Sequence, residues 1–358
     1  MRIAFLALVF SCQLAAGQSI PELRALLSSD DDSTKVATMG RLSSMYTRSN
    51  TDSAFYFGRA ALAFAREVKL DFGEASANNA LGTIYFFQSD YDSAIFYYNE
   101  CLKISEKLND SLRIGAMLNN IGTVLTYQTK YDSSLEVLFR ARELRMLIDD
   151  PKITSTVNNI GNAYQRMQDW EKALEYYEEA AALKEKYEQT LSLSNTLNNI
   201  GIVLKQMDRA EEAIPYYEKS LKIAEDFNDK IKQANAHNNL AALYHLSPDL
   251  YGQAETHYRK SIALKEEMGD KTGLFNSYTQ LADLLSASGK AKEARDFIYQ
   301  AEKLGEEIGQ NLFTSAFLKT KASILYRSGQ KDQAFEALNE AYELKTEEMA
   351  LDRNEKIA

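Results

Sequence analysis

The chain has 358 residues, of which 45% are hydrophobic and 26% are charged, and this balance excludes both a disordered and a collagen-like polypeptide. Only 4 prolines and 16 glycines interrupt it, which favours a protein made almost entirely of helices. The formal net charge of -10 argues against a nucleic-acid partner, because phosphate binding requires a clustered positive field.

Residues 1–17 have the composition of a secretory signal peptide. Arg2 precedes an apolar run at 3–10, and small residues follow at 15–17. This order is typical of a signal that is removed after export, so we expect a periplasmic or secreted protein that begins at Gln18. The apolar run is too short to span a membrane.

Two other interpretations of this segment stay open. An apolar first helix of the domain would leave the protein in the cytoplasm. The sequence before Cys12 also faintly resembles a lipoprotein cleavage site, although Phe10 fits such a site poorly. If the signal is cleaved, Cys101 is the one cysteine left, and we expect it to be a buried small side chain rather than a reactive thiol.

Residues 18–34 form an N-terminal segment that leads into a periodic sequence. Its acidic triplet at 30–32 indicates the entry of a helix, with Asp32 or Ser33 as the expected capping residue. This segment therefore precedes the first repeat rather than belonging to it.

From residue 35 the sequence repeats with a period of about 40 residues, the signature of stacked helix-turn-helix units. A small residue marks the same place in successive units, at Gly82, Gly122, Gly161, Gly201, Ala241, Ala282 and Ala322. Leu42 stands one period before Gly82. The pattern predicts about eight units over residues 35–345, of which the sixth is lengthened by the turn at 246–250.

Each unit carries two further small residues, twelve and nineteen positions after the first, or one position later in the lengthened sixth unit. The second series is Ala54, Ala94, Ser134, Ala173, Ala213, Ala254, Ala294 and Ala334, and the third is Ala61, Cys101, Ala141, Ala180, Ser220, Ser261, Ala301 and Ala341. Small residues let two antiparallel helices approach closely while aromatic side chains fill the gaps between them. Each unit then depends on its neighbours to bury the rest of its apolar face.

This arrangement, with a tyrosine near the eleventh place and an aromatic near the twenty-fourth, resembles the tetratricopeptide repeat family over residues 35–345. The long unit is similar to that of kinesin light chains, bacterial regulatory solenoids, exported bacterial repeat proteins and sensor ectodomains. The resemblance implies an all-α fold, a right-handed α-α superhelix of about eight repeats that binds proteins or peptides in a concave groove. Gly58 and Lys321 depart from the pattern in the first and eighth units, as terminal repeats often do.

An enzyme or a metal site has little support in the sequence. The three histidines lie in the sixth unit, but His237 and His245 stand eight residues apart on one helix, about 12 Å along its axis, and cannot share a metal. His257 lies on the partner helix without a cluster of zinc-spaced ligands. Phosphate-binding loops and hydrolase motifs are missing from the sequence. We therefore predict no enzymatic activity, no cofactor and no metal.

Pairs of asparagines recur in the middle of four successive first helices, although asparagine is a poor residue for a helix interior. Their second members are Asn120, Asn159, Asn199 and Asn239, and their first members are Asn119, Asn158, Asn198 and Asn238. The family resemblance implies that the second members line the groove as a ladder that holds the backbone of a ligand. An alternative stays open, in which the amides bond to each other or to the next helix and set the repeat register.

Other groove-facing places change in residue type along the chain. They are Phe86, Phe87 and Tyr127 in the early units, Gln165, Arg166, Lys205 and Gln206 in the middle, and His245, Tyr326 and Arg327 in the late units. Among these we predict Tyr127, Arg166 and Lys205 as ligand contacts. An extended peptide with an apolar part and an acidic part would complement them. Alternatively, Phe86 and Phe87 only close the core of their hairpin.

Residues 346–358 continue the last repeat as a helical extension without proline or glycine. By resemblance to periplasmic sensors, this segment is the start of a stalk that continues into a longer protein, and it offers a site of self-association. A cap that solvates the end of the stack is the alternative. The segment contains no membrane span.

The sequence as a whole predicts a non-enzymatic scaffold outside the cytoplasm that binds a protein or an extended peptide. Such a scaffold either acts alone or is the input domain of a signalling protein. Two alternatives stay open: a cytoplasmic peptide-responsive regulator, if the N-terminus is no signal, and an enzyme that uses scattered residues of the groove.

Overall fold

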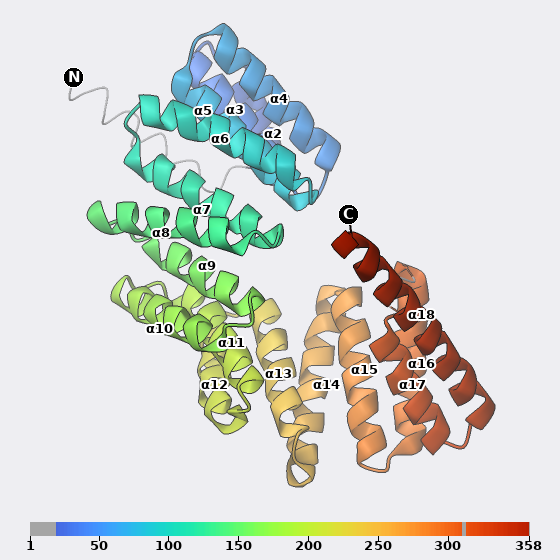
Figure 1. Ribbon diagram of the computed structural model, residues 1–358. Coiled ribbons are helices and arrows are strands. Elements are labelled where there is room, and N and C mark those ends of the chain that lie inside the picture. The colour runs from blue at the N-terminus through green and yellow to red at the C-terminus, as the bar shows by residue number, and fades with distance from the viewer. Residues whose placement is uncertain (1–18, 310–312, 358) are drawn as a thin grey trace. The chain divides into compact units, whose positions relative to one another are not determined.

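The computed structural model describes residues 19–309 and 313–357, which form 17 α-helices, two short 3-10 helices and no strand (Figure 1). The predicted signal peptide at 1–17 lies outside the described residues. The chain divides into two compact units, Met1–Leu183 and Lys184–Ala358, and the boundary falls within helix α10.

The first unit contains a short N-terminal helix and then the helix pairs of four repeats. Its elements are α2 (Ile20–Ala25), η1 (Leu26–Ser28), α3 (Asp32–Tyr46), α4 (Thr51–Glu67), α5 (Asp71–Phe87), α6 (Tyr91–Lys107), α7 (Ser111–Tyr127), α8 (Tyr131–Leu147), α9 (Ile153–Arg166) and α10 (Trp170–Lys186). Helix α3 is capped by Asp31, whose side chain accepts from the Thr34 backbone N–H. The expected cap at Asp32 or Ser33 was therefore wrong by at least one residue, because both lie inside the helix.

The second unit contains the helix pairs of the other four repeats. Its elements are α11 (Thr190–Gln206), α12 (Ala210–Asp226), α13 (Lys230–Tyr244), η2 (Pro248–Leu250), α14 (Tyr251–Met268), α15 (Lys271–Ala287), α16 (Ala291–Ile308), α17 (Ser315–Arg327) and α18 (Lys331–Ile357). Helix η2 occupies the lengthened turn of the sixth repeat. The eight pairs confirm the predicted all-α fold of helix-turn-helix repeats.

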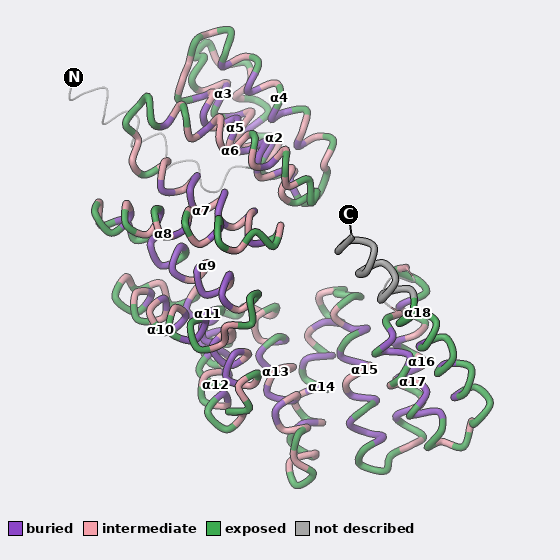
Figure 2. Tube along the Cα trace, viewed as in Figure 1, coloured by how far each residue is buried: buried purple, intermediate pink, exposed green. Residues whose placement is uncertain are grey.

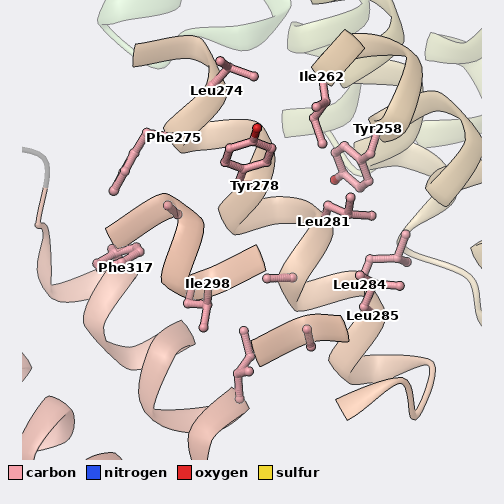
Figure 3. Packing of buried hydrophobic residues seen from close by; sticks show 14 of the residues in the cluster. Tyr258, Ile262, Leu274, Phe275, Tyr278, Leu281, Leu284, Leu285, Ile298 and Phe317 are labelled. Carbon is pink, nitrogen blue, oxygen red and sulfur yellow. The ribbon is translucent and has the colours of Figure 1, made fainter. Parts of the chain in front are cut away.

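The small residues act as predicted, because large side chains of the paired helix pack directly against them. A Cβ atom added to Gly161 would lie 2.7 Å from the ring of Tyr177, so only glycine fits this place in the fourth repeat. Cys101 is fully buried in the third series of small residues, as expected. Buried residues follow the inner sides of the helix pairs (Figure 2). In the second unit, one cluster that includes Tyr258, Leu281 and Ile298 runs from α13 to α18 (Figure 3).

Three buried cations occupy one place of the repeat, four residues after the third small residue, which the sequence analysis did not single out. Arg145, Lys184 and Lys265 are exposed by only 2%, 5% and 6%. Each reaches the first helix of the next repeat, where it donates to Thr156, Thr196 and Ser277 respectively. Burial lowers the pKa of Lys184 to about 8. These side chains join neighbouring repeats by hydrogen bonds inside an apolar seam.

The histidines form a pair in the sixth repeat. His237 of α13 is 6% exposed, and its Nδ1 lies 3.0 Å from Nδ1 of His257 on α14. Burial, followed by the nearby His257 and Lys260, lowers the pKa of His237 from 6.5 to about 4. The third, fourth, fifth and eighth repeats carry an aliphatic residue at the place of His237, namely Leu118, Val157, Leu197 and Leu318. Among the residues that the structure describes, no group of three or more side chains could hold a metal ion.

We expect His237→Leu to remove a pH dependence of stability. The lowered pKa means that the unfolded chain binds a proton that the folded chain excludes, so stability present above pH 6.5 is lost as the pH falls toward 4. Because one pKa unit is worth about 1.4 kcal/mol, the interval from 6.5 down to pH 5 corresponds to a loss of roughly 2 kcal/mol at pH 5. Urea unfolding of wild type and variant at neutral pH and near pH 5 measures it. Equal pH dependence in the two proteins would contradict this role of His237.

Candidate functional site

A cavity of about 400 Å³ opens between the third and fourth repeats, at the C-terminal ends of their first helices. Helices α7 and α9 form most of it, and the first residue of α10 closes one side. The lining residues are Thr123, Thr126, Tyr127, Asn159, Asn162, Gln165, Arg166 and Trp170. Three of the predicted contacts, Tyr127, Asn159 and Arg166, therefore meet in one place.

Aromatic side chains in mutual contact lead up to this cavity from the second repeat. The ring of Phe86 lies 5.2 Å from that of Tyr127, edge to face, and 5.6 Å from that of Phe87. Phe86 packs against the core of its hairpin, whereas Phe87 and Tyr127 are 42% and 43% exposed. The alternative that both phenylalanines only close the hairpin thus holds for Phe86 and not for Phe87. The exposed rings offer an apolar surface beside the cavity.

Arg166 gives the cavity its positive charge. Its guanidinium lies 4.3 Å from the centre of the Tyr127 ring, in a cation–π contact. The side chain is exposed and makes no ion pair within the part of the chain that the structure describes. A free guanidinium over an aromatic face suits a carboxylate, to which it can donate two parallel hydrogen bonds.

Tyr177 fixes the amides at the base of the cavity. This side chain is fully buried, and its hydroxyl lies 2.7 Å from Oδ1 of Asn162 and 2.5 Å from Oε1 of Gln165. Burial raises the pKa of Tyr177, so the hydroxyl stays a hydrogen-bond donor. Because both amide oxygens face Tyr177, the amide N–H groups of Asn162 and Gln165 are turned the other way.

The asparagines of the first unit form a continuous chain of side-chain hydrogen bonds across three repeats. Asn120 donates to Asn79 of the preceding repeat at 3.4 Å, and Asn159 donates to Asn119 at 3.1 Å. Asn119 in turn donates to Asn120 at 3.4 Å. We call Asn79, Asn120, Asn119, Asn159, Asn162 and Tyr177 the amide chain, since Asn162 donates to Asn159 and accepts from Tyr177.

The amide chain brings the two interpretations of the asparagine pairs together. The second member of a pair bonds to the first member of the preceding pair, which is the inter-repeat contact expected of a register device. Both N–H groups of Asn159 are engaged, by Asn119 and by Thr123 at 3.2 Å. Asn159 nevertheless lines the cavity, so a ligand that bonds to this amide must exchange one of these bonds.

The second unit contains the same kind of hydrogen bond between asparagines of neighbouring repeats, but fewer residues take part. Asn239 of α13 donates to Asn198 of α11 at 2.6 Å, and Asn238 accepts from Ser277 of α15 at 3.1 Å. Asn158 and Asn199 are half-buried at the corresponding places of α9 and α11. All eight paired asparagines are half-buried, and of these only Asn159 lines the cavity.

Lys205 is not part of the cavity. It lies on α11 in the second unit, where its charge and that of Asp283 act on His245. Burial lowers the pKa of His245, Asp283 raises it and Lys205 lowers it. Lys205 near the end of α11 and Asp283 of α15 thus both act on the charge of His245, which follows α13 directly. Arg166 lies in the first unit and Lys205 in the second, and the groove that the sequence predicts for both stays a prediction.

Several residues of the cavity escaped the sequence analysis, namely Thr123, Thr126, Asn162 and Trp170. Two of them could have been found from their helical spacing. Thr123 follows Asn119 by four residues and Asn162 follows Asn159 by three, so each lies on the helix face of that asparagine. The cavity is a property of two neighbouring repeats and is not encoded in either repeat alone.

Comparison with known proteins supports the repeat assignment. A family model described as "Tetratricopeptide repeat" matches five segments of the chain, residues 73–146, 113–186, 152–226, 192–267 and 273–347. No curated protein matches the chain. The matched segments together span more than half of the sequence, from the second repeat to the eighth.

Solved structures share the fold at low sequence identity. A Signal Transduction ATPase with Numerous Domains from Pyrococcus horikoshii, which has a tetratricopeptide repeat sensor, is 14% identical with a TM-score of 0.69, and the match covers 94% of this chain and 54% of that one. Aspartyl phosphate phosphatase F from Bacillus subtilis is 16% identical with a TM-score of 0.62, and the match covers 86% of this chain and 94% of that one. The Rap conjugation gene regulator of plasmid pLS20, solved with the Phr* peptide, is 20% identical with a TM-score of 0.53. The match covers 77% of this chain and 74% of that one. The chain spans about half the length of the ATPase, and these likenesses concern the fold alone.

Proposed function

Because the chain belongs to the tetratricopeptide repeat family, we propose that it is a non-enzymatic scaffold that binds an extended peptide or protein segment in a concave groove lined by its first helices. The observation that carries this proposal is the cavity in which Tyr127, Asn159 and Arg166 meet. A pocket with an aromatic wall, several fixed amides and one charged group has the mixture of apolar and polar groups that ligand sites use.

The ligand is a peptide segment with an acidic residue next to apolar residues. Arg166 supplies the charge for the carboxylate, in a chain whose net charge of -10 otherwise repels acidic partners. Phe87 and Tyr127 supply exposed rings for the apolar part. The amide N–H groups of Gln165 hold the peptide backbone, since the oxygen of this amide faces Tyr177.

Two of the structural relatives agree with a signalling role. The Rap conjugation gene regulator was solved in complex with a peptide, and the Pyrococcus ATPase uses its tetratricopeptide repeats as a sensor. By analogy, this chain acts as the input domain of a signalling protein, or as an independent binding protein. The analogy rests on a common fold and is therefore weaker than the chemistry of the cavity.

We place this scaffold in the periplasm or outside the cell, on the strength of the signal-like order of charged, apolar and small residues at 1–17. Among the described residues no helix is both long and apolar enough to cross a membrane. A cytoplasmic peptide-responsive regulator is the second candidate, favoured by the fold shared with the Rap regulator. N-terminal sequencing of the protein from its native cell distinguishes them, since export predicts a chain that begins at Gln18.

The experiment that tests peptide binding starts with selection from a displayed library of random peptides. We expect the selected peptides to contain acidic and apolar residues. Replacing Asn120, Asn159, Asn199 and Asn239 together by alanine should then weaken binding at least about fivefold, because Asn159 lines the cavity and one amide bond contributes about 1 kcal/mol. Unchanged affinity in a variant that keeps its helical circular dichroism would contradict the ladder. Loss of binding with loss of helicity would instead assign the amides to stability, and single Gln165→Ala would then test the contact.

A further inference from the structure

A second arginine lies over an aromatic ring in the first unit. Arg48 comes from the turn between α3 and α4, and its guanidinium lies 4.7 Å from the centre of the Phe87 ring of α5. Arg48 is exposed, and no ion pair joins it to a carboxylate within the described residues. Arg48 and Phe87 therefore make the same kind of cation–π contact as Arg166 and Tyr127.

The two arginines lie at opposite ends of one run of aromatic rings. Phe87 contacts Phe86, and Phe86 contacts Tyr127. The contacts that join the two guanidinium groups measure 4.7, 5.6, 5.2 and 4.3 Å in order, so these groups are no more than about 20 Å apart. We call Arg48, Phe87, Phe86, Tyr127 and Arg166 the arginine–aromatic row.

The arginine–aromatic row crosses four successive repeats. Phe87, Tyr127 and Arg166 occupy one place of the second, third and fourth repeats, five residues after the small residue of the first helix. Arg48 belongs to the first repeat and reaches forward to the ring of the second, whereas Arg166 reaches back to the ring of the third. A ligand that covers these rings thus meets a positive charge at each end.

Other arginines of the first unit are neutralised by the chain itself. Those that face an acidic side chain, at 2.7 to 3.5 Å, are Arg66, Arg113, Arg142 and Arg145. Arg48 and Arg166 face aromatic rings instead, in a chain with a net charge of -10. Their guanidinium groups can therefore each donate two parallel hydrogen bonds to a carboxylate of a partner.

We propose that the peptide bound here carries two carboxylates, one on each side of an apolar stretch, and that Arg48 binds one carboxylate while Arg166 binds the other. This inference rests on the proposed function, because it assumes that a peptide binds at the cavity beside Tyr127. An extended peptide advances about 3.3 Å per residue, so the two acidic residues are about six positions apart or fewer. The apolar residues between them cover the exposed rings of Phe87 and Tyr127.

Substitution of single charges on both molecules tests this pairing. The probe is the tightest peptide selected from the displayed library, together with versions in which each acidic residue in turn is changed to its amide. We expect Arg48→Gln and Arg166→Gln each to weaken binding of the probe about tenfold, as loss of a hydrogen bond to a charged group does. Arg48→Gln should then have no effect on the peptide that lacks one acidic residue, and Arg166→Gln none on the peptide that lacks the other.

Arg140→Gln is the matched control, because Arg140 is exposed on α8 and is not among the residues that line the cavity. It should change the affinity by less than about threefold. A peptide that depends on Arg166 and not on Arg48, or a single acidic residue coupled to both arginines, would overturn this inference and leave the proposed function standing. Binding that is indifferent to both arginines, or a library that yields no binder, would contradict the proposed function and this inference with it.

Discussion

Replacing Arg145 by alanine is expected to lower the free energy of unfolding by about 3 to 5 kcal/mol, the cost of leaving a buried charge without its partner. Arg145 is 2% exposed and Asp150 is 6% exposed, and Nε of the arginine lies 3.5 Å from Oδ2 of the aspartate. The guanidinium also donates to the Lys152 carbonyl at 2.5 Å and to Thr156 at 3.0 Å. Its removal leaves Asp150 and these acceptors in the seam between the third and fourth repeats.

Two control variants separate the charge from the packing. Arg145→Lys should lose less than Arg145→Ala, because lysine occupies the same place in the fourth and sixth repeats, at Lys184 and Lys265. Arg145→Ala combined with Asp150→Asn should recover part of the loss, since no buried charge then lacks a partner. Equilibrium unfolding in urea measures all three. A loss below about 1 kcal/mol for Arg145→Ala would show that the seam does not depend on this pair.

The second large effect concerns the ligand. Arg166→Glu is expected to weaken the binding of a selected acidic peptide by about 30-fold or more, because reversing the charge of a groove that holds a carboxylate costs at least 2 kcal/mol. Arg166 lies on the surface and over the Tyr127 ring, so the substitution should leave stability nearly unchanged. Isothermal titration calorimetry of the peptide with wild type and variant gives the ratio.

Arg140→Glu is the matched control for this charge reversal. Arg140 is also exposed, and it lies on second helix α8 of the third repeat, away from the cavity lining. The same change in net charge at this place should alter peptide affinity by less than about threefold, through long-range repulsion that salt screens. If both variants weakened binding equally, the peptide would be responding to net charge and not to Arg166.

The repeat architecture could be predicted because the same pattern of small and large residues recurs in eight units of the sequence. Glycine or alanine at a fixed period has one physical reason, the close approach of two helices, as Gly161 and Tyr177 illustrate. The lengthened turn of the sixth repeat was likewise a local feature. A period therefore determines helix number and pairing even though it says little of the contacts between repeats.

The amide chain could be predicted only in part. Periodic asparagines indicated a special role, yet the bond from Asn159 to Asn119 joins residues in neighbouring repeats and depends on how the helices are offset. The buried cations were missed because Arg145 and Lys184 look like ordinary surface residues of an amphipathic helix, and only packing against the next repeat buries them. The cavity arises in the same way, from side chains of α7, α9 and α10 together.

The role of the N-terminal helix α2 could not be predicted from the sequence either. Residues 18–34 show no period in the sequence, because α2 is only six residues long. Its role follows from Leu23, which is fully buried beside Leu42 and Phe57 of the first repeat.

The most direct test of the account is to locate a bound peptide on the protein. A photoreactive phenylalanine analogue in place of Tyr127, at the edge of the cavity, is irradiated with a selected acidic peptide, and the same analogue in place of Phe96 on second helix α6 serves as the control. We predict that the peptide is cross-linked from position 127 and that unlabelled peptide competes for it. Equal labelling from position 96, or no labelling from position 127 by a peptide that still binds, would contradict binding at this cavity.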